Sequence, residues 1–296
     1  MSKQHPVIAV TGSSGSGTTT VKTAFEHIFR RLDVSSAIIE GDSYHRFSRA
    51  EMRAAIKQAS ERGENISHFG PSANRLCDLA ELFKTYGQTG NGKRRFYVHN
   101  EEEAVQHGVP AGEFTEWEDL PADTDMLLYE GLHGAMVTEE CDIGEFADLL
   151  IGVVPIVNLE WIQKIHRDTM DRGYAEIDVT QTILRRMEDY VNHITPPFSR
   201  TDINFQRVPT VDTSNPFIAR DIPTADESFV VIRFRDPTKF DIDFPYLLSM
   251  VNSSFMSRRN TIVVPGGKML LAMELILMPI LKSMVDASKN EPRLVA

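Results

Sequence analysis

An apolar stretch near the start of the sequence runs directly into a glycine-rich loop, and this junction constrains the fold more than any other feature. Residues 7–10 read Val-Ile-Ala-Val, which is typical of a buried parallel strand. Residues 12–19 read Gly-Ser-Ser-Gly-Ser-Gly-Thr-Thr, and residues 19–32 place apolar side chains at helical spacing. This order indicates a phosphate-binding loop at the carboxyl end of a strand.

The loop follows the pattern Gly-x-x-x-x-Gly-Lys-Ser/Thr with one departure, because Thr18 stands at the lysine position. Glycines let backbone N–H groups converge on phosphate oxygens, and the helix N-terminus adds partial positive charge. Thr19 stands where a hydroxyl ligates Mg²⁺. A glycine- and serine-rich turn without a ligand is the alternative. We predict a nucleotide phosphate site at Gly12, Ser13, Ser14, Gly15, Ser16, Gly17, Thr18, Thr19 and Thr20.

The composition is that of an acidic globular protein. Hydrophobic residues make up 42% of the chain, and 31 Lys and Arg against 42 Asp and Glu give a formal charge of −11. This charge argues against nucleic-acid binding. No long apolar run precedes the first strand, and Glu274 and Pro279 interrupt the most apolar stretch, so we expect neither a signal peptide nor a membrane span. Cys77 and Cys141 show no metal-type spacing, and we expect structural thiols in a reducing, cytoplasmic setting.

The pattern of strands and helices predicts an α/β fold with a mixed, mostly parallel sheet covered by helices. We expect one domain over residues 1–296, with a hairpin excursion near 88–120 and helices near 158–195. The expected strands lie at 37–40, 94–99, 125–129, 148–155, 228–234 and 261–264. The expected helices lie at 48–62, 73–86, 159–172, 179–193 and from 269 onward.

Asp42 follows a glycine at the end of the strand at 37–40, where open α/β sheets place their ligands. A carboxylate there can accept the proton of an acceptor hydroxyl in phosphoryl transfer. His45 and Arg49 are four residues apart, so on a helical turn they share a face and can bind the acceptor's phosphate or hydroxyls. The alternative is a solvated loop in which Asp42 only caps the next helix.

Two further segments add candidate residues. Glu130 ends an apolar strand, and such a carboxylate can hold Mg²⁺ beside Thr19, directly or through water. Tyr97 and His99 lie on the expected excursion strand and can line an acceptor pocket. An exposed hairpin with alternating polar and apolar residues explains these two equally well.

A charged cluster contains Lys164, Arg167, Asp168 and Arg172 at helical spacing. A bare pattern of this kind is usually a solvated helix laced with salt bridges. A mobile lid is the functional interpretation, because the loop has no lysine and a transferred phosphoryl group needs positive charge from elsewhere. A lid also excludes water, which protects ATP from hydrolysis.

Together these segments resemble the bacterial phosphoribulokinases, within the wider uridine-kinase-like P-loop group. The resemblance extends over nearly the whole chain. It is carried by the runs at 10–15, 40–47, 129–134, 151–155, 158–168, 201–207 and 211–217.

The resemblance implies a P-loop kinase fold and the Calvin-cycle reaction ATP + D-ribulose 5-phosphate → ADP + D-ribulose 1,5-bisphosphate, with Mg²⁺. Asp42 then resembles the base for the C1 hydroxyl, and Glu130 the carboxylate associated with Mg²⁺. Lys164 and Asp168 match lid positions near the reacting phosphates. Bacterial members share the loop without lysine. The residues that resemble sugar-phosphate and lid positions are His45, Arg49, Arg167 and Arg172.

The resemblance to bacterial phosphoribulokinases also implies how the activity is regulated. Plant-type members use a cysteine near the phosphate loop for redox control, and this loop has none, so redox switching is not expected. Bacterial members are activated by NADH, inhibited by AMP and assemble as homo-oligomers such as octamers. The candidate effector residues are Arg31, Arg186, Arg233 and Arg258.

Two alternatives stay open. One is a related P-loop kinase that acts on another small hydroxyl acceptor, such as uridine; Arg49, Arg167 and Arg172 favour a phosphorylated acceptor instead. The other is a nucleotide-binding regulator without turnover. Asp42 beside Thr19 and Glu130 argues against it, because a protein that only binds needs no base.

Overall fold

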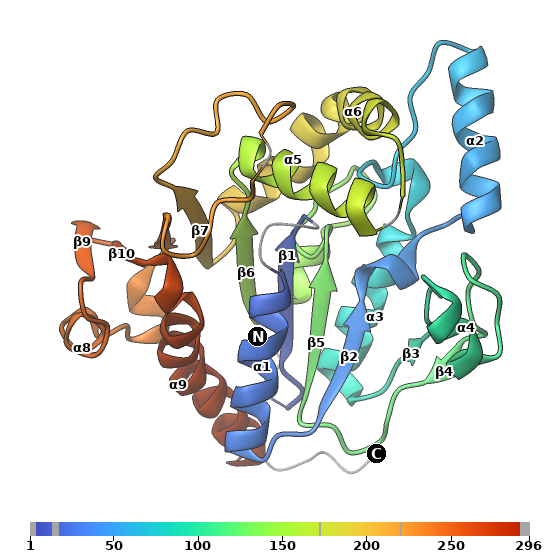
Figure 1. Cartoon of the computed structure of the whole chain (residues 1–296). Coiled ribbons are helices and arrows are strands. Elements are labelled where there is room, and N and C mark those ends of the chain that lie inside the picture. The colour runs from blue at the N-terminus through green and yellow to red at the C-terminus, as the bar shows by residue number, and fades with distance from the viewer. Residues whose placement is uncertain (1–3, 14–17, 172, 220, 291–296) are drawn as a thin grey trace.

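The computed structural model describes residues 4–13, 18–171, 173–219 and 221–290. A central sheet of eight strands separates two layers of helices, as Figure 1 shows. Five neighbouring strands are parallel and the last three are antiparallel. In spatial order the strands are β2 (Ser36–Glu40), β5 (Met126–Gly131), β1 (Val7–Gly12), β6 (Leu149–Val154), β7 (Ile203–Pro209), β8 (Ser228–Phe234), β10 (Thr261–Pro265) and β9 (Phe255–Arg258).

The hydrophobic patterns explain this division. Every residue of β1 is buried, as expected of a central strand covered on both faces. Strand β8 alternates buried and exposed positions, which suits an antiparallel strand with one covered face. The sequence therefore predicted a mixed, mostly parallel sheet correctly, although β7 and β9 were missed.

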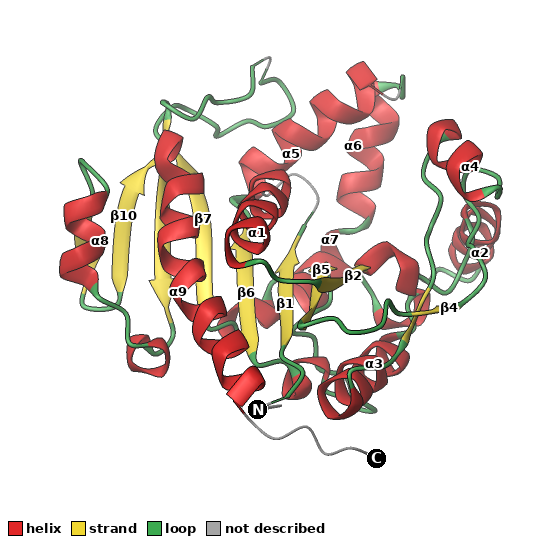
Figure 2. Cartoon of the chain, turned by 90° about the horizontal axis from the view of Figure 1, so that it is seen from below, coloured by secondary structure: helices red, strands yellow, loops and turns green. Residues whose placement is uncertain are grey.

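Successive residues of β1 face opposite cores. Ile8 and Val10 pack into the core under α1 (Thr18–Leu32) and α9 (Met269–Asn290). Val7 and Ala9 pack into the core under α3 (Leu76–Thr89). Helices α1 and α9 contact each other and cover one face of the sheet, as Figure 2 shows.

The helix that follows the Asp42 segment begins where the sequence predicts. The Ser48 side chain accepts a hydrogen bond from the Glu51 backbone at 3.4 Å, and the Glu51 carboxylate accepts one from the Ser48 backbone at 2.8 Å. This capping box starts α2 (Arg49–Glu61). Helix α3 instead ends later than expected, because Gly90 (φ 72°) supplies the left-handed turn and Gly87 lies inside the helix.

The excursion differs from the expected hairpin strand. The short strands β3 (Lys93–Arg94) and β4 (Glu118–Asp119) pair, and an antiparallel bridge between Tyr97 and Phe114 follows them. The residues after 100 form the short helix α4 (Glu101–His107). Asn100 caps this helix by accepting a hydrogen bond from the Glu103 backbone at 3.0 Å. The chain starts a helix at this point instead of continuing as a strand, because Asn favours helix N-termini and is rare in strand interiors.

The two long helices expected near 159–193 are a series of shorter pieces. They lie across the carboxyl end of the parallel strands, as Figure 1 shows for α5 and α6. The pieces are α5 (Val157–His166), a π-helical turn Arg167–Asp171, α6 (Glu176–Arg185), α7 (Met187–Asp189) and a second π-helical turn Tyr190–Ile194.

The expectation of free thiols is wrong. Cys77, at the start of α3, and Cys141, in the loop after β5, form a disulfide bond with a Cα–Cα distance of 5.5 Å. Spacing could not predict this bond, because 64 positions of sequence separate the two cysteines. Among the described residues, no helix is both long and apolar enough to cross a membrane.

The ends of β2 and β5 approach each other closely at Gly131, which leaves no room there for a side chain. A Cβ atom there would lie 2.7 Å from the Gly41 Cα atom and 2.5 Å from the Tyr129 hydroxyl. Gly131→Ala should therefore lower the free energy of unfolding by about 1–3 kcal/mol, measured by denaturant titration. Gly267→Ala is the control, because its Cβ would meet Asp226 only at 3.4 Å. Equal stability of the two variants would contradict the expected clash.

The disulfide should stabilise the fold mainly by restricting the unfolded chain. Reduction should lower the free energy of unfolding by about 2–4 kcal/mol, because the bond closes a long loop. Denaturant titration with and without a thiol reductant measures this effect. The control is the double variant Cys77→Ser/Cys141→Ser, in which the reductant should change nothing. A wild-type curve that does not respond to reductant would refute this expectation.

Candidate active site

The site lies where β1, β2 and β5 end side by side. Parallel pairing sets Val10 opposite Glu130 and Glu40 opposite Glu130, so the three strands finish at one edge of the sheet. The segments that carry Ser13, Asp42 and Glu130 therefore meet there. The Thr11 hydroxyl donates a hydrogen bond to the Leu132 carbonyl at 2.8 Å and joins the start of the glycine loop to the end of β5.

Part of the glycine loop can be placed. Gly12 ends β1, Ser13 is buried, and helix α1 begins at Thr18. The order strand, loop and helix is therefore confirmed. The predicted contacts at 14–17, and the side chains of Thr18 and Thr19, lie outside the described part of the structure.

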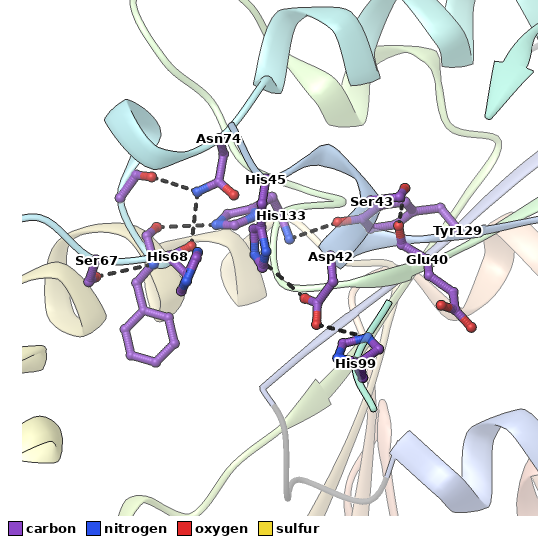
Figure 3. A network of polar contacts seen from close by, with 12 residues as sticks. Glu40, Asp42, Ser43, His45, Ser67, His68, Asn74, His99, Tyr129 and His133 are labelled. Carbon is purple, nitrogen blue, oxygen red and sulfur yellow. Dashed lines mark hydrogen bonds and ion pairs between the residues drawn. The ribbon is translucent and has the colours of Figure 1, made fainter. Parts of the chain in front are cut away.

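Asp42 lies in a short 3-10 turn directly after β2 (Figure 3). One of its carboxylate oxygens is 3.5 Å from His45 Nε2 and the other is 3.7 Å from His99 Nε2. The Asp42 side chain is 44% exposed, so a ligand can reach it. A carboxylate flanked by two imidazoles and open on one side is suited to accept a hydroxyl proton.

Three histidines surround this turn: His45 and His133 are buried, and His68 is half-buried. Burial lowers the pKa of His45 to about 3, with a smaller contribution from nearby His133. Burial likewise lowers the pKa of His68 to about 3 and that of His133 to about 4. The three imidazoles are therefore neutral near pH 7, and each can donate one hydrogen bond and accept another.

Contacts fix how these rings lie. The rings of His45 and His68 lie tilted against each other, with centroids 4.1 Å apart and an angle of 33° between planes. His133 Nε2 is 3.2 Å from the Phe69 carbonyl, which can only accept, so that nitrogen carries the proton. The Asn74 amide donates to the His68 carbonyl at 2.9 Å and so fixes this part of the loop (Figure 3).

The excursion completes the wall of the pocket. Arg49 Nη2 donates a hydrogen bond to the His99 carbonyl at 2.7 Å. The Tyr97 ring meets the rings of His45 and His99 edge-on, with centroids 6.1 and 4.9 Å away. The structure thus places His45 and His99 against Asp42, with Tyr97 against both rings and Arg49 bonded to the His99 backbone. His45 and Arg49 do not share a helical turn as expected, because His45 is extended and α2 begins only at Arg49.

Glu130 lies in a cluster of negative charge. Burial raises its pKa, Glu40 and Asp42 raise it further, and Lys22 opposes the rise. Such a cluster favours a bound cation, and carboxylate oxygens are ligands that Mg²⁺ prefers. Within the described residues, no group of three or more His, Cys, Asp or Glu side chains is arranged to hold a metal ion.

A charged cluster lies on α5 and the π-helical turn after it, the segment that the sequence suggests as a lid. Asp168 pairs with Lys164 and also with Arg167, whose Nη2 atom is 3.0 Å from an Asp168 oxygen. Burial favours a higher pKa for Asp168, but these two cations hold it below its usual value. Burial lowers the pKa of Lys164. The predicted residue Arg172 lies outside the described residues.

The four effector candidates do not lie in one place. Arg31 of α1 is 3.6 Å from Glu274 of α9. Arg233 and Arg258 are exposed, and both pair with Thr261 across neighbouring strands. Arg186 differs, because it is largely buried in the lid, 5.6 Å above the Phe69 ring, and burial lowers its pKa to about 10.

Sequence reasoning missed His68 among the residues around Asp42. It lies in an irregular segment between α2 and α3, more than 20 positions from Asp42, so neither spacing nor periodicity could indicate its role. His133 follows the recognised Glu130-Gly131 pair, and only its burial reveals that it belongs to the site.

Comparison with known proteins agrees with this geometry. Residues 7–214 match the family model described as Phosphoribulokinase / Uridine kinase family. The chain is 58% identical over 291 residues to a phosphoribulokinase of Nitrobacter vulgaris, an alignment that covers 98% of this chain and 100% of the relative. It is 59% identical over 290 residues to phosphoribulokinase 1 of Cereibacter sphaeroides, covering 98% and 99% of the two chains.

A solved structure is also similar. The phosphoribulokinase from Rhodobacter spheroides superposes with a TM-score of 0.89 at 56% identity, covering 97% of this chain and 99% of that one. The fold and the site define a kinase of the P-loop class. The chain belongs to the phosphoribulokinase / uridine kinase family, and its relatives are bacterial phosphoribulokinases. The family and fold that the sequence predicted are confirmed.

The buried histidines should make the fold sensitive to acid. The unfolded chain binds protons at these imidazoles below about pH 6.5, whereas the folded chain binds them only near pH 3–4. Stability should therefore fall as the pH drops below about 6.5. The free energy of unfolding at pH 7.5 and pH 5, from denaturant titration, measures this loss.

Replacement of one histidine should reduce this dependence. His68→Gln should reduce the slope of the free energy of unfolding against pH by up to about 1.4 kcal/mol per pH unit, because one proton fewer is taken up on unfolding. His107→Gln, outside the site, should keep the wild-type slope. Identical slopes in both variants would show that His68 is not held neutral by the fold.

Proposed function

We propose that the chain transfers the γ-phosphate of ATP to the C1 hydroxyl of D-ribulose 5-phosphate, giving D-ribulose 1,5-bisphosphate and ADP. The observation that carries the assignment is Asp42, an accessible carboxylate between His45 and His99 at the end of the sheet where the glycine loop begins. Phosphoribulokinases at 58–59% identity over nearly the whole chain support this choice of acceptor.

Asp42 is the base in this proposal. The C1 oxygen attacks the γ-phosphorus, its proton passes to the Asp42 carboxylate, and ADP leaves from the opposite side. Neutral His45 orients the acceptor by a hydrogen bond without competing for that proton, and His99 lies at the other oxygen of the carboxylate. Arg49 and Tyr97 complete the acceptor pocket, and Arg49 favours a phosphorylated acceptor.

The lid supplies the charge that the glycine loop lacks. Lys164 and Arg167 are held by Asp168 next to the site and stabilise the negative charge of the transferred group. Arg172 joins them in this proposal. Bound Mg²⁺ would neutralise the phosphates, with Glu130 and the Thr19 hydroxyl as its protein ligands.

We also infer further properties from the family resemblance. The chain acts as one cytoplasmic domain, assembles as a homo-oligomer and is activated by NADH. Of the four effector candidates, Arg233 and Arg258 lie on either side of Thr261 and can share one effector, whereas Arg31 and Arg186 lie elsewhere. Exposed Phe255 on edge strand β9, beside half-exposed Phe229, supports self-association at this end of the sheet. Activity measured with and without NADH, and mass measured in solution, test these inferences.

Asp42→Asn tests the role of the base. The value of kcat should fall by about 10²–10⁴-fold, because the amide cannot accept the proton, while ATP binding changes little. A coupled ADP-release assay gives kcat, and calorimetry gives the ATP dissociation constant. Exposed Asp226→Asn should behave like wild type. A near-normal kcat in Asp42→Asn would remove Asp42 from this role.

The acceptor is tested separately. Wild-type protein should release ADP with ribulose 5-phosphate and not with uridine. Turnover of uridine alone would favour the related kinase activity. Failure with both acceptors, with and without NADH, would refute the proposed function.

A further inference from the structure

An arginine of the excursion, Arg95, holds the backbone of the turn that carries Asp42. Its Nε atom donates a hydrogen bond to the Ser43 carbonyl at 2.8 Å, and its Nη2 atom donates one to the His45 carbonyl at 2.7 Å. The two bonds join segments that lie at least 50 positions apart in the sequence. One guanidinium group therefore fixes the backbone on the C-terminal side of Asp42 at two points.

The two carbonyl groups belong to residues that are closed to water. Ser43 is 1% exposed and His45 is 6% exposed. The carbonyl group between them, that of Tyr44, accepts a hydrogen bond from the Arg75 backbone at 2.8 Å. A buried carbonyl group that loses its donor costs free energy, so the turn can keep this conformation without Arg95 only at a cost.

Aromatic rings fix the guanidinium group itself. Its central carbon lies 3.8 Å from the centroid of the Phe114 ring and 4.9 Å from that of the Trp117 ring. Burial lowers the pKa of Arg95 to about 10, so the group stays charged near pH 7 and keeps all its donors. A planar guanidinium group can stack on rings and donate two hydrogen bonds at once, which a lysine ammonium group cannot.

Arg95 thereby joins the two parts of the acceptor pocket. The turn carries Asp42 and leads to His45, whereas Arg95 lies on the segment that continues to His99. The His99 Nε2 atom is 3.7 Å from one Asp42 oxygen, and the His45 Nε2 atom is 3.5 Å from the other (Figure 3). The position of Asp42 between the two imidazoles therefore depends on how the excursion docks on the turn.

We propose that Arg95 is a positioning residue that docks the excursion on the turn Gly41–Tyr44 and so holds Asp42 between His45 and His99 for the acceptor. It acts through the backbone of the turn and does not touch the reacting atoms. This inference rests on the proposed function for the identity of the acceptor. The neighbouring Arg94 offers a matched control, because it pairs with Glu118 at 2.8 Å instead.

Binding of the acceptor without nucleotide tests the inference directly. Calorimetry gives the dissociation constant of ribulose 5-phosphate for wild type, Arg95→Ala, Arg95→Lys and Arg94→Ala. Arg95→Ala should weaken acceptor binding about tenfold, because the groups that meet the acceptor lose their common orientation. Arg95→Lys should recover little of this loss, since an ammonium group is a point donor that cannot reproduce the planar fork. Arg94→Ala should match wild type.

Steady-state kinetics and chemical rescue separate positioning from a general loss of structure. In Arg95→Ala, kcat/KM for ribulose 5-phosphate should fall about 10–100-fold, whereas the dissociation constant of ATP–Mg²⁺ should stay within about twofold of wild type. Guanidinium ions at millimolar concentration should restore part of this activity, since the free cation can occupy the place of the lost group. An ammonium salt at the same ionic strength should restore nothing.

Hydrogen exchange at the turn gives a readout that needs no substrate. The backbone amides of residues 41–47 should exchange faster in Arg95→Ala than in wild type, because the turn loses two of its hydrogen bonds. Arg94→Ala should exchange at the wild-type rate in this segment.

The inference fails if Arg95→Ala is folded and binds the acceptor as wild type does. It also fails if the affinities for ATP and for the acceptor fall equally and guanidinium restores nothing, because that pattern indicates a purely structural role. If Arg95→Ala does not fold, Arg95→Lys decides by the same binding and exchange criteria. Wild-type protein that neither binds nor uses ribulose 5-phosphate would refute the proposed function, and hydrogen exchange would then decide the role of Arg95.

Discussion

The parallel pairing of β2, β5 and β1 is the constraint on which the rest of the structure depends. It sets Glu40, Glu130 and the end of β1 at one edge of the sheet, so the nucleotide loop, the metal candidate and the base candidate meet without a dedicated scaffold. Gly41 and Gly131 make the meeting possible, because a Cβ atom on either would press against the other's Cα atom. Three segments that are distant in the sequence become one site for this reason.

The electrostatics of the site follow from burial. Burial raises the pKa of Glu130, and the carboxylates of Glu40 and Asp42 at the strand ends raise it further, whereas His45 and His133 are kept neutral. The cations Lys164 and Arg167 share Asp168. In the proposed reaction, these groups would serve as a metal region, a neutral wall for the sugar and a positively charged cover.

Local signals were reliable where the cause of structure was local. The Ser48–Glu51 capping box places the start of α2 correctly, because its hydrogen bonds join residues three apart. The end of α3 was misplaced, since two glycines compete and only the packed structure selects Gly90 for the left-handed turn. The disulfide was missed because chain spacing carries no information on the approach of Cys77 to Cys141.

The sequence by itself determined the strand, glycine loop and helix, the acidic residue after each key strand and the charged cluster of the lid, because each is encoded within a short run. The tertiary structure alone decided that His68 and His133 lie close to His45 and that the Tyr190 hydroxyl donates a hydrogen bond to Glu160 of α5. It also separated Arg186 from the other effector candidates. These outcomes depend on burial and on contacts between distant segments, and only the packing of the sheet against its helices and lid specifies them.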